Sequence, residues 1–234
     1  KVLTYPRTDS RHLPEDYIAT VKETLTSLAD TNNYNQFAKQ ITKGGWVKPN
    51  KRIFDNAKIS DHFAIIPTGV VPKNLSEPEQ KLYDLVTRRF LAVFFPAAEF
   101  LVTTRFTEVS GHQFKTEGKV MTNPGWLAVY GKENGDDKDG ANLPPVAKGE
   151  HVLADKLTAN GLVTKPPARY NEATLLSAME GAGKLVDSDE LRDAMAGKGL
   201  GTPATRAAII EGLLTEKYLI REGRELIDRK STRL

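Results

Sequence analysis

The chain has 234 residues, which is enough for one large domain or for two to three small ones. Its formal charge of +3 is close to balance, so a site for a polyanion has to be a local patch. The absence of cysteine excludes disulfides, thiolate zinc sites and a cysteine nucleophile, and no apolar run reaches the roughly 18 residues of a membrane span. The first residue is lysine rather than methionine, and we expect the chain to be a piece of a longer protein.

The most informative pattern lies in the first twelve residues. Tyr5 precedes Arg7 by two positions, and Thr8, Asp9 and Ser10 follow directly. Tyrosine is a known covalent nucleophile, and the planar guanidinium of arginine matches phosphate and stabilises charge that develops on phosphoryl oxygens. The alternative is a strand that ends at the tyrosine, followed by a turn in which the Thr-Asp-Ser run makes local hydrogen bonds. The spacing alone leaves both interpretations open.

The first part of the chain predicts helices. An apolar stripe predicts an amphipathic helix over 14–29, and a short helix is expected over 36–43. Ser76 with Glu79 three residues later forms a capping box, which predicts a helix that ends before Pro96.

After this proline the periodicity becomes that of strands. Alternating apolar residues predict a hairpin of strands 100–106 and 113–121, joined by a Ser-Gly turn. Further strands are expected over 125–130 and 150–165.

Helical patterns return after about residue 168, over 171–180, 188–196 and 203–217. Thr202 is the expected N-cap of the last of these helices, with Pro203 at its first position.

A short hairpin is expected at the end of the chain. Its strands are the apolar runs 218–220 and 225–227. Helix, turn, helix and β-wing together predict a winged-helix-like unit, a common way to meet a nucleic-acid backbone. Tight helical domains use similar turns, so this pattern leaves DNA binding open.

His62 is the second candidate for chemistry. Histidine is the usual proton carrier near neutral pH, and the neighbouring Asp61 is placed to orient it. With Tyr5 and Arg7, it would hydrogen-bond a scissile phosphate; the alternative is a histidine that ends a strand. The four histidines do not cluster with carboxylates at metal-ligand spacing, so we expect no metal centre in this chain.

A third candidate is the glycine-rich run Gly197-Lys198-Gly199-Leu200-Gly201 and the helix start after it. The hydroxyls of Thr202 and Thr205, the free amides of the helix start and the guanidinium of Arg206 are all suited to phosphate. An ordinary glycine turn with a helix cap explains the glycines equally well. It does not specifically require Thr205 or Arg206.

Three segments, in this order, resemble the type IA DNA topoisomerases and in particular the topoisomerase III branch. Thr4-Tyr5-Pro6-Arg7-Thr8-Asp9-Ser10-Arg11 resembles the segment around the nucleophilic tyrosine, and Asp61-His62-Phe63-Ala64-Ile65-Ile66-Pro67-Thr68 resembles the segment with the active-site histidine. The third resemblance is to the return into the DNA-binding helical domain. It is carried by Thr164-Lys165-Pro166-Pro167-Ala168-Arg169-Tyr170, Glu172-Ala173-Thr174-Leu175-Leu176 and Gly199–Arg206.

The resemblance implies a cleaving and rejoining enzyme that uses no ATP. Tyr5 would attack one DNA strand and become joined to its 5′-phosphate, Arg7 would stabilise the phosphoryl charge, and His62 would contact the scissile or a neighbouring phosphate. The released 3′-hydroxyl would later attack the phosphotyrosine, and strand passage between the two steps would change DNA topology. The resemblance also implies that Thr8, Asp9 and Ser10 support the loop of the tyrosine. The residues expected to bind DNA are Thr8, Asp9, Ser10, Arg169, Thr202, Thr205 and Arg206.

The implied fold class is a multidomain α+β protein with three parts. Residues 1–97 would form a helix-rich, tyrosine-bearing catalytic domain, 98–168 part of a β-rich arch, and 169–234 part of a winged-helix-like helical domain. Single-stranded DNA would be the partner, with a helicase as a candidate partner of the longer protein. We expect no membrane association and a cytoplasmic location at the bacterial nucleoid.

One departure from the family pattern is large. The acidic Toprim domain that binds Mg²⁺ in the full-length enzymes precedes the tyrosine and is not in this sequence, so we expect no metal cofactor and no activity in this chain alone. Phe63 also stands where topoisomerase III relatives often have a second histidine.

Two other classes of protein fit part of the pattern. A tyrosine recombinase combines Tyr, Arg and His at a phosphate, but its tyrosine usually comes late in the catalytic domain, whereas Tyr5 comes first. A winged-helix DNA-binding module without catalysis fits residues 188–227 and leaves Tyr5 and His62 without a role.

Overall fold

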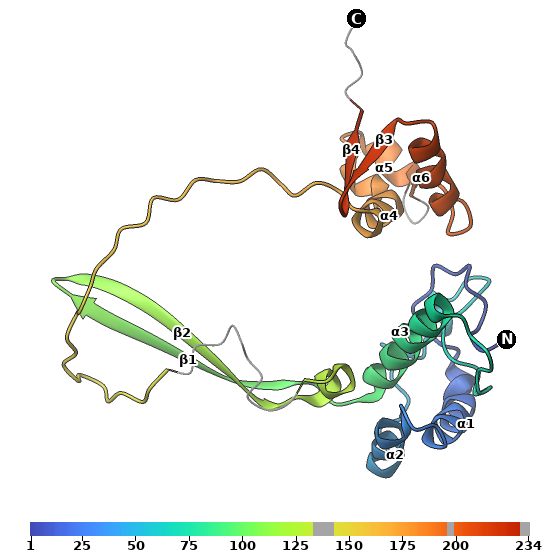
Figure 1. The fold of residues 1–234 in the computed structure, drawn as a ribbon, viewed down its shortest axis with the longest axis horizontal. Helices are drawn as coiled ribbons and strands as arrows, with labels where there is room; N and C mark the ends of the chain where they lie inside the picture. The colour runs from blue at the N-terminus through green and yellow to red at the C-terminus, as the bar shows by residue number, and fades with distance from the viewer. Residues whose placement is uncertain (133–142, 196–198, 230–234) are drawn as a thin grey trace, which may run out of the picture. The chain divides into compact units, whose positions relative to one another are not determined.

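The computed structural model describes residues 1–132, 143–195 and 199–229. The contacts between residues divide the chain into two compact units, 1–159 and 160–234 (Figure 1). Each unit mixes helix with strand, as expected for an α+β protein. The division into parts 1–97, 98–168 and 169–234 stays a prediction.

Three helices form the compact part of unit 1. The turn η1 (Glu15–Tyr17) leads into α1 (Ile18–Ala29), followed by α2 (Asn35–Gly44) and α3 (Glu77–Phe94), which confirms the helices expected in this region. The capping box at the start of α3 is present, with the Ser76 backbone N–H donating to Glu79 Oε2 at 2.8 Å. Gly45 ends α2 in the left-handed region at φ 59°, which glycine adopts at little cost.

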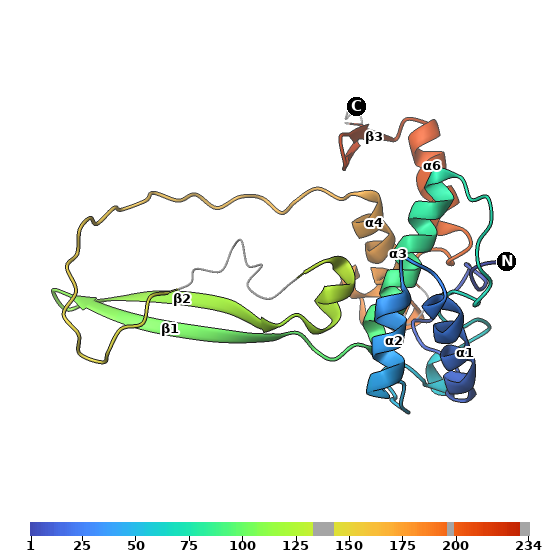
Figure 2. The ribbon, with the colours of Figure 1, turned by 60° about the horizontal axis from the view of Figure 1, so that its bottom comes forward.

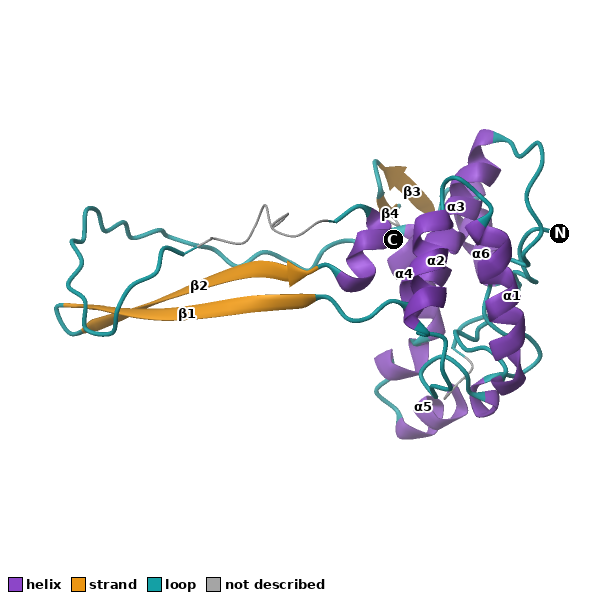
Figure 3. Cartoon of the chain, turned by 90° about the horizontal axis from the view of Figure 1, so that it is seen from below, coloured by secondary structure: helices purple, strands orange, loops and turns teal. Residues whose placement is uncertain are grey.

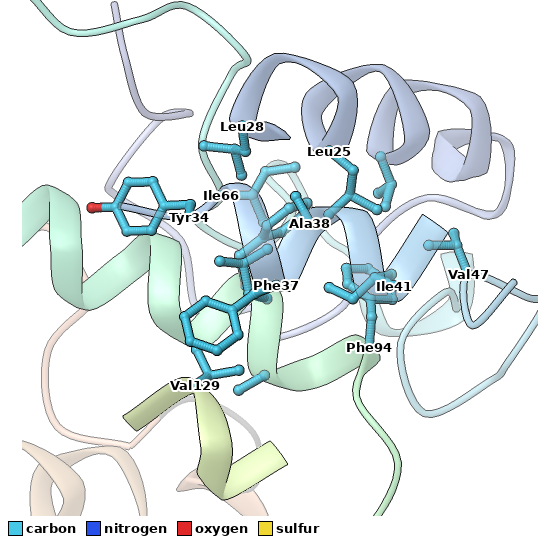
Figure 4. Packing of buried hydrophobic residues seen from close by; sticks show 14 of the residues in the cluster. Leu25, Leu28, Tyr34, Phe37, Ala38, Ile41, Val47, Ile66, Phe94 and Val129 are labelled. Carbon is cyan, nitrogen blue, oxygen red and sulfur yellow. The ribbon is translucent and has the colours of Figure 1, made fainter. Parts of the chain in front are cut away.

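One hydrophobic core joins these helices (Figure 4). The apolar stripe of α1 packs against α2, and α3 packs against both α2 and the turn η3. Each fully buried aliphatic side chain contributes about 1.5–3 kcal/mol. The core residues labelled in the figure are Leu25, Leu28, Tyr34, Phe37, Ala38, Ile41, Val47, Ile66, Phe94 and Val129.

The strands of unit 1 form a two-stranded antiparallel hairpin (Figure 2). β1 (Glu99–Val109) pairs with β2 (His112–Asn123), and the turn residues Ser110 and Gly111 both have positive φ, at 51° and 79°. The hairpin and its Ser-Gly turn are therefore confirmed, and both strands extend beyond the predicted ranges.

The strand expected over 125–130 was a wrong prediction, because these residues form the 3-10 turn η3 (Gly125–Tyr130). Gly125 has φ 47°, and a side chain there would lie 2.6 Å from the carbonyl oxygen of Pro96. The chain therefore turns sharply at a point where two backbone segments touch. Of the apolar residues that suggested a strand, Val129 is fully buried in the helical core, whereas Trp126 is 37% and Tyr130 39% exposed.

The strand expected over 150–165 was also wrong. The whole stretch is without helix or strand, as the loop colouring in Figure 3 shows. Its apolar residues are open to solvent, with Leu153 92% and Leu162 90% exposed. An alternating apolar pattern favours a strand, but a strand forms only when another strand pairs with it. None of the described residues pairs with this stretch.

In its described residues, unit 2 contains three α-helices and a small hairpin. The elements are α4 (Glu172–Glu180), η4 (Ala182–Leu185), α5 (Asp189–Met195), α6 (Arg206–Thr215), β3 (Leu219–Glu222) and β4 (Glu225–Asp228). Arg221 on β3 ties the hairpin to two helices, since its guanidinium donates to Glu172 Oε1 and to Glu211 Oε1, both at 2.8 Å. The helices and the hairpin are those expected, and their winged-helix-like description stays a prediction.

The start of α6 differs from the prediction. The N-cap is Thr205 rather than Thr202, and Pro203 lies in the preceding turn rather than at the first helical position. The side chain of Thr205 accounts for the shift, because its Oγ1 accepts the Thr202 backbone N–H at 2.9 Å and closes that turn before the helix begins. Gly197 and Lys198 of the predicted glycine-rich run lie outside the described residues.

Candidate active site around Tyr5

The segment that carries Tyr5 lies beside the segment that carries His62. At one end Thr4 N–H donates to the Ile66 carbonyl at 3.0 Å, and at the other Leu13 N–H donates to the Ile53 carbonyl at 2.7 Å. Leu13 and Ile66 are buried in the core and anchor the two segments. Hydrophobic anchors on both sides therefore hold an exposed loop, residues 5–12, against residues 58–64.

Tyr5 and His62 touch. Their ring centroids are 4.4 Å apart and the ring planes are tilted by 45°. Tyr5 is 46% exposed, so the tyrosine is open to solvent. Two side chains that are 57 positions apart in the sequence are thus in contact at an exposed position, while their roles stay predictions.

Hydroxyl groups link the two segments next to these rings. Thr8 Oγ1 donates to the carbonyl oxygen of His62 at 2.8 Å, and Ser10 Oγ donates to the carbonyl oxygen of Lys58 at 2.8 Å. Ser60 Oγ donates to Asp9 Oδ1 at 3.3 Å. Sequence reasoning assigned no role to Ser60 or Lys58, whose only signal was proximity to the Asp61-His62 pair.

The segment that carries Tyr5 has a net positive charge, and the facing segment adds the exposed carboxylate of Asp61 beside His62. Residues 1–12 carry the cations Lys1, Arg7 and Arg11 against the single carboxylate Asp9. All four are exposed. The overall charge of the chain is nearly balanced, so a site for a polyanion has to be a local patch of positive charge, and this segment is such a patch.

The predicted DNA-binding residues of unit 2 have different environments. Arg169 is exposed, and the hydroxyls of Thr202 and Thr205 lie 3.2 Å apart at an exposed turn. Arg206 is only 8% exposed, and its guanidinium donates to the carbonyl oxygens of Leu200 at 3.1 Å and Gly201 at 3.2 Å. Arg206 therefore holds the glycine turn closed in this structure, and contacts of any of these four residues with DNA stay predictions.

No metal-binding cluster lies in the described ranges. Across 1–132, 143–195 and 199–229, no three His, Asp or Glu side chains are close enough together to hold a metal ion. These side chains therefore do not supply a magnesium site. Within the same ranges, no helix is long and apolar enough to cross a membrane.

Comparison with known proteins gives consistent matches. The sequence profile of a family described as DNA topoisomerase matches residues 1–233. DNA topoisomerase 3 of Bacillus subtilis (strain 168) is 42% identical over 236 residues, and that of Bacillus licheniformis is 42% identical over 234 residues. Each alignment covers 97% of this chain and 32% of the relative, so the chain spans about a third of the length of these proteins.

A solved structure supports the same fold. Full-length topoisomerase I from Thermotoga maritima matches with a TM-score of 0.54 at 21% identity, over 97% of this chain and 32% of that one.

Proposed function

The chain belongs to the type IA DNA topoisomerases, in the topoisomerase III branch, and from that membership we propose that it carries the strand-cleaving tyrosine of such an enzyme. The observation that carries the proposal is the contact between the exposed Tyr5 ring and the His62 ring, 4.4 Å apart in a cationic loop. Because the relatives are about three times as long, the activity is proposed for the longer protein.

The reaction is a transfer of a phosphodiester bond to tyrosine and back. The Tyr5 phenol oxygen attacks the phosphorus and loses its proton, the bond from phosphorus to the 3′-oxygen breaks, and that oxygen leaves as a hydroxyl. The strand is then joined to Tyr5 through its 5′-phosphate. The 3′-hydroxyl later attacks the phosphotyrosine and restores the strand. Both linkages are phosphodiesters, so the bond energy is retained and the cycle uses no ATP.

Arg7 and His62 would assist this transfer. Negative charge on the phosphoryl oxygens grows as the phenol attacks, and a guanidinium two residues from the nucleophile stabilises that charge. The imidazole of His62, whose ring lies against that of the tyrosine, would hydrogen-bond the same phosphate. Passage of another DNA segment through the open break changes DNA topology.

The remaining parts of the proposal concern the longer protein and unit 2. Single-stranded DNA would contact Asp9 in unit 1, and Arg169 and the Thr202–Thr205 turn are separate candidate contacts in unit 2. Magnesium would be held by an acidic domain outside this chain, with a helicase as a candidate partner at the bacterial nucleoid. This chain without that domain is expected to be inactive, and relaxation of supercoiled DNA by the purified chain with magnesium would contradict this part.

Replacement of the nucleophile tests the proposal. In the longer protein, Tyr5→Phe should abolish cleavage of a labelled single strand, because the variant lacks the attacking oxygen. Tyr130→Phe is a matched control, since Tyr130 is 39% exposed and also contacts an aromatic ring, that of Trp126. If Tyr5→Phe still cleaved at the wild-type rate, Tyr5 would not be the nucleophile, and DNA binding without catalysis by this chain would be the better account.

A further inference from the structure

Two hydroxyls in the Tyr5 loop are each engaged twice. Thr8 Oγ1 donates to the carbonyl of His62 and accepts the backbone N–H of Ser10 at 3.1 Å. Ser10 Oγ donates to the carbonyl of Lys58 and accepts the backbone N–H of His12 at 3.1 Å. Each side chain therefore fixes its own loop and ties that loop to the opposite segment.

The hydroxyl protons are already used in these bonds. A serine or threonine hydroxyl has one proton to donate, and in both residues that proton lies toward a backbone carbonyl of the opposite segment. The same proton is not available to a phosphate oxygen. The hydrogen bonds of Thr8 and Ser10 therefore do not favour their predicted role as DNA contacts. They favour a role in holding the segment that carries His62, because both hydroxyls donate to it.

The Thr8 bond ends on the residue whose ring contacts the nucleophile. Its acceptor is the carbonyl of His62 itself, and the His62 ring lies 4.4 Å from that of Tyr5. His62 is exposed, so the packing of a core does not fix it. A misplacement of about 1 Å at a reacting centre can cost on the order of 100-fold in rate.

We propose that Thr8 is a positioning residue that holds His62 against Tyr5, with Ser10 supporting the same segment at Lys58. This inference rests on the proposed function of Tyr5 and His62. Thr8 touches neither DNA nor the reacting atoms in this account, and it acts on the transfer only through the placement of His62.

Variants of Thr8 separate this role from others. Thr8→Val keeps the shape of the side chain and removes both hydrogen bonds, whereas Thr8→Ser keeps the hydroxyl. Thr68→Val is the matched control, because Thr68 Oγ1 also donates to a backbone carbonyl distant in sequence, that of Lys1 at 2.9 Å, and makes this bond outside residues 5–12 and 58–64. Thr8→Ala serves as a second deletion of the hydroxyl if the valine variant does not fold.

The first measurement is the rate of covalent complex formation with a single strand by the longer protein. Thr8→Val should be slower by about ten-fold, and Thr8→Ser should be close to wild type. In a His62→Ala background, Thr8→Val should cause no further loss, because the residue through which it acts is gone. Equal losses in both backgrounds, or an equal loss in Thr68→Val, would overturn the proposal.

The second measurement needs no catalysis and uses this chain. The Tyr5 ring shifts the NMR signals of the His62 ring protons through its ring current, and Thr8→Val should move those signals while Thr8→Ser leaves them in place. Tyr5→Phe keeps an aromatic ring, so the signals should stay displaced although cleavage is lost. Unchanged His62 signals in Thr8→Val would overturn the positioning role even if Tyr5 proved to be the nucleophile. Conversely, a Tyr5→Phe variant that cleaves would refute the proposed function and leave the NMR result standing.

Discussion

Replacing Arg206 by leucine separates a structural role of this guanidinium from a role in holding DNA. The side chain is 8% exposed, and it satisfies the carbonyls of Leu200 and Gly201, the latter in a residue with φ 69°. Each lost hydrogen bond costs about 1 kcal/mol, and more when the carbonyl is left without a partner, so the free energy of opening of the turn should fall by about 2 kcal/mol.

Hydrogen exchange measures this loss directly. A change of about 2 kcal/mol should speed exchange of the amides at the start of α6 by about 30-fold. Arg169→Leu is the matched control, because Arg169 is an exposed arginine of the same unit and should leave exchange unchanged. Unchanged exchange in Arg206→Leu, together with weaker binding of a single strand, would refute the structural role and favour a direct contact with phosphate.

Two further predictions concern the stability of unit 1. Gly125→Ala should destabilise this unit by about 3 kcal/mol, because the residue has φ 47° and the new side chain would meet the Pro96 carbonyl. The fluorescence of Trp46 and Trp126, which both lie in unit 1, follows its thermal unfolding, and an unchanged Tm would contradict the prediction. Burial first, and then the hydrogen bond to Asp84, raise the pKa of Tyr34, so the unfolded chain loses this proton at lower pH than the folded one. The stability that this shift contributes is complete below the pKa of tyrosine in the unfolded chain, about 10, and declines above it. The free energy of unfolding should fall with pH by up to about 1.4 kcal/mol per pH unit more steeply in wild type than in Tyr34→Phe. Equal slopes in urea titrations of the two proteins would show that Tyr34 does not titrate as described.

Local signals in the sequence were sufficient for most of the helices and strands. The Ser76 and Glu79 pair marks the start of α3, and a Ser-Gly pair marks the tip of the long hairpin, because each depends on residues only a few positions apart. The errors at 125–130 and 150–165 have the opposite origin. The turn at Gly125 depends on contact with residues 96–97, and a strand at 150–165 depends on a partner strand. The local periodicity of the sequence contains neither kind of information, so it could not predict these two structures.

The candidate site shows the same division. Residue types and order pointed to Tyr5 and His62, and the structure brings these two side chains into contact, while their catalytic roles stay predictions. The bond from Thr8 to the His62 carbonyl spans 54 positions, and a threonine hydroxyl gives no sequence signal for a backbone acceptor that distant. The sequence suggested Arg206 as a phosphate ligand. Its burial was not predictable, because it depends on how the glycine turn folds around the guanidinium.

The identity of the nucleophile and of the DNA end that it holds is the most direct test of this account. The longer protein would be incubated with a single strand, the covalent complex trapped by denaturation, and the linked peptide and nucleotide identified by mass spectrometry. The account predicts that the DNA is attached to Tyr5 through its 5′-phosphate. Attachment to another residue, or attachment through a 3′-phosphate as in the recombinase alternative, would contradict it.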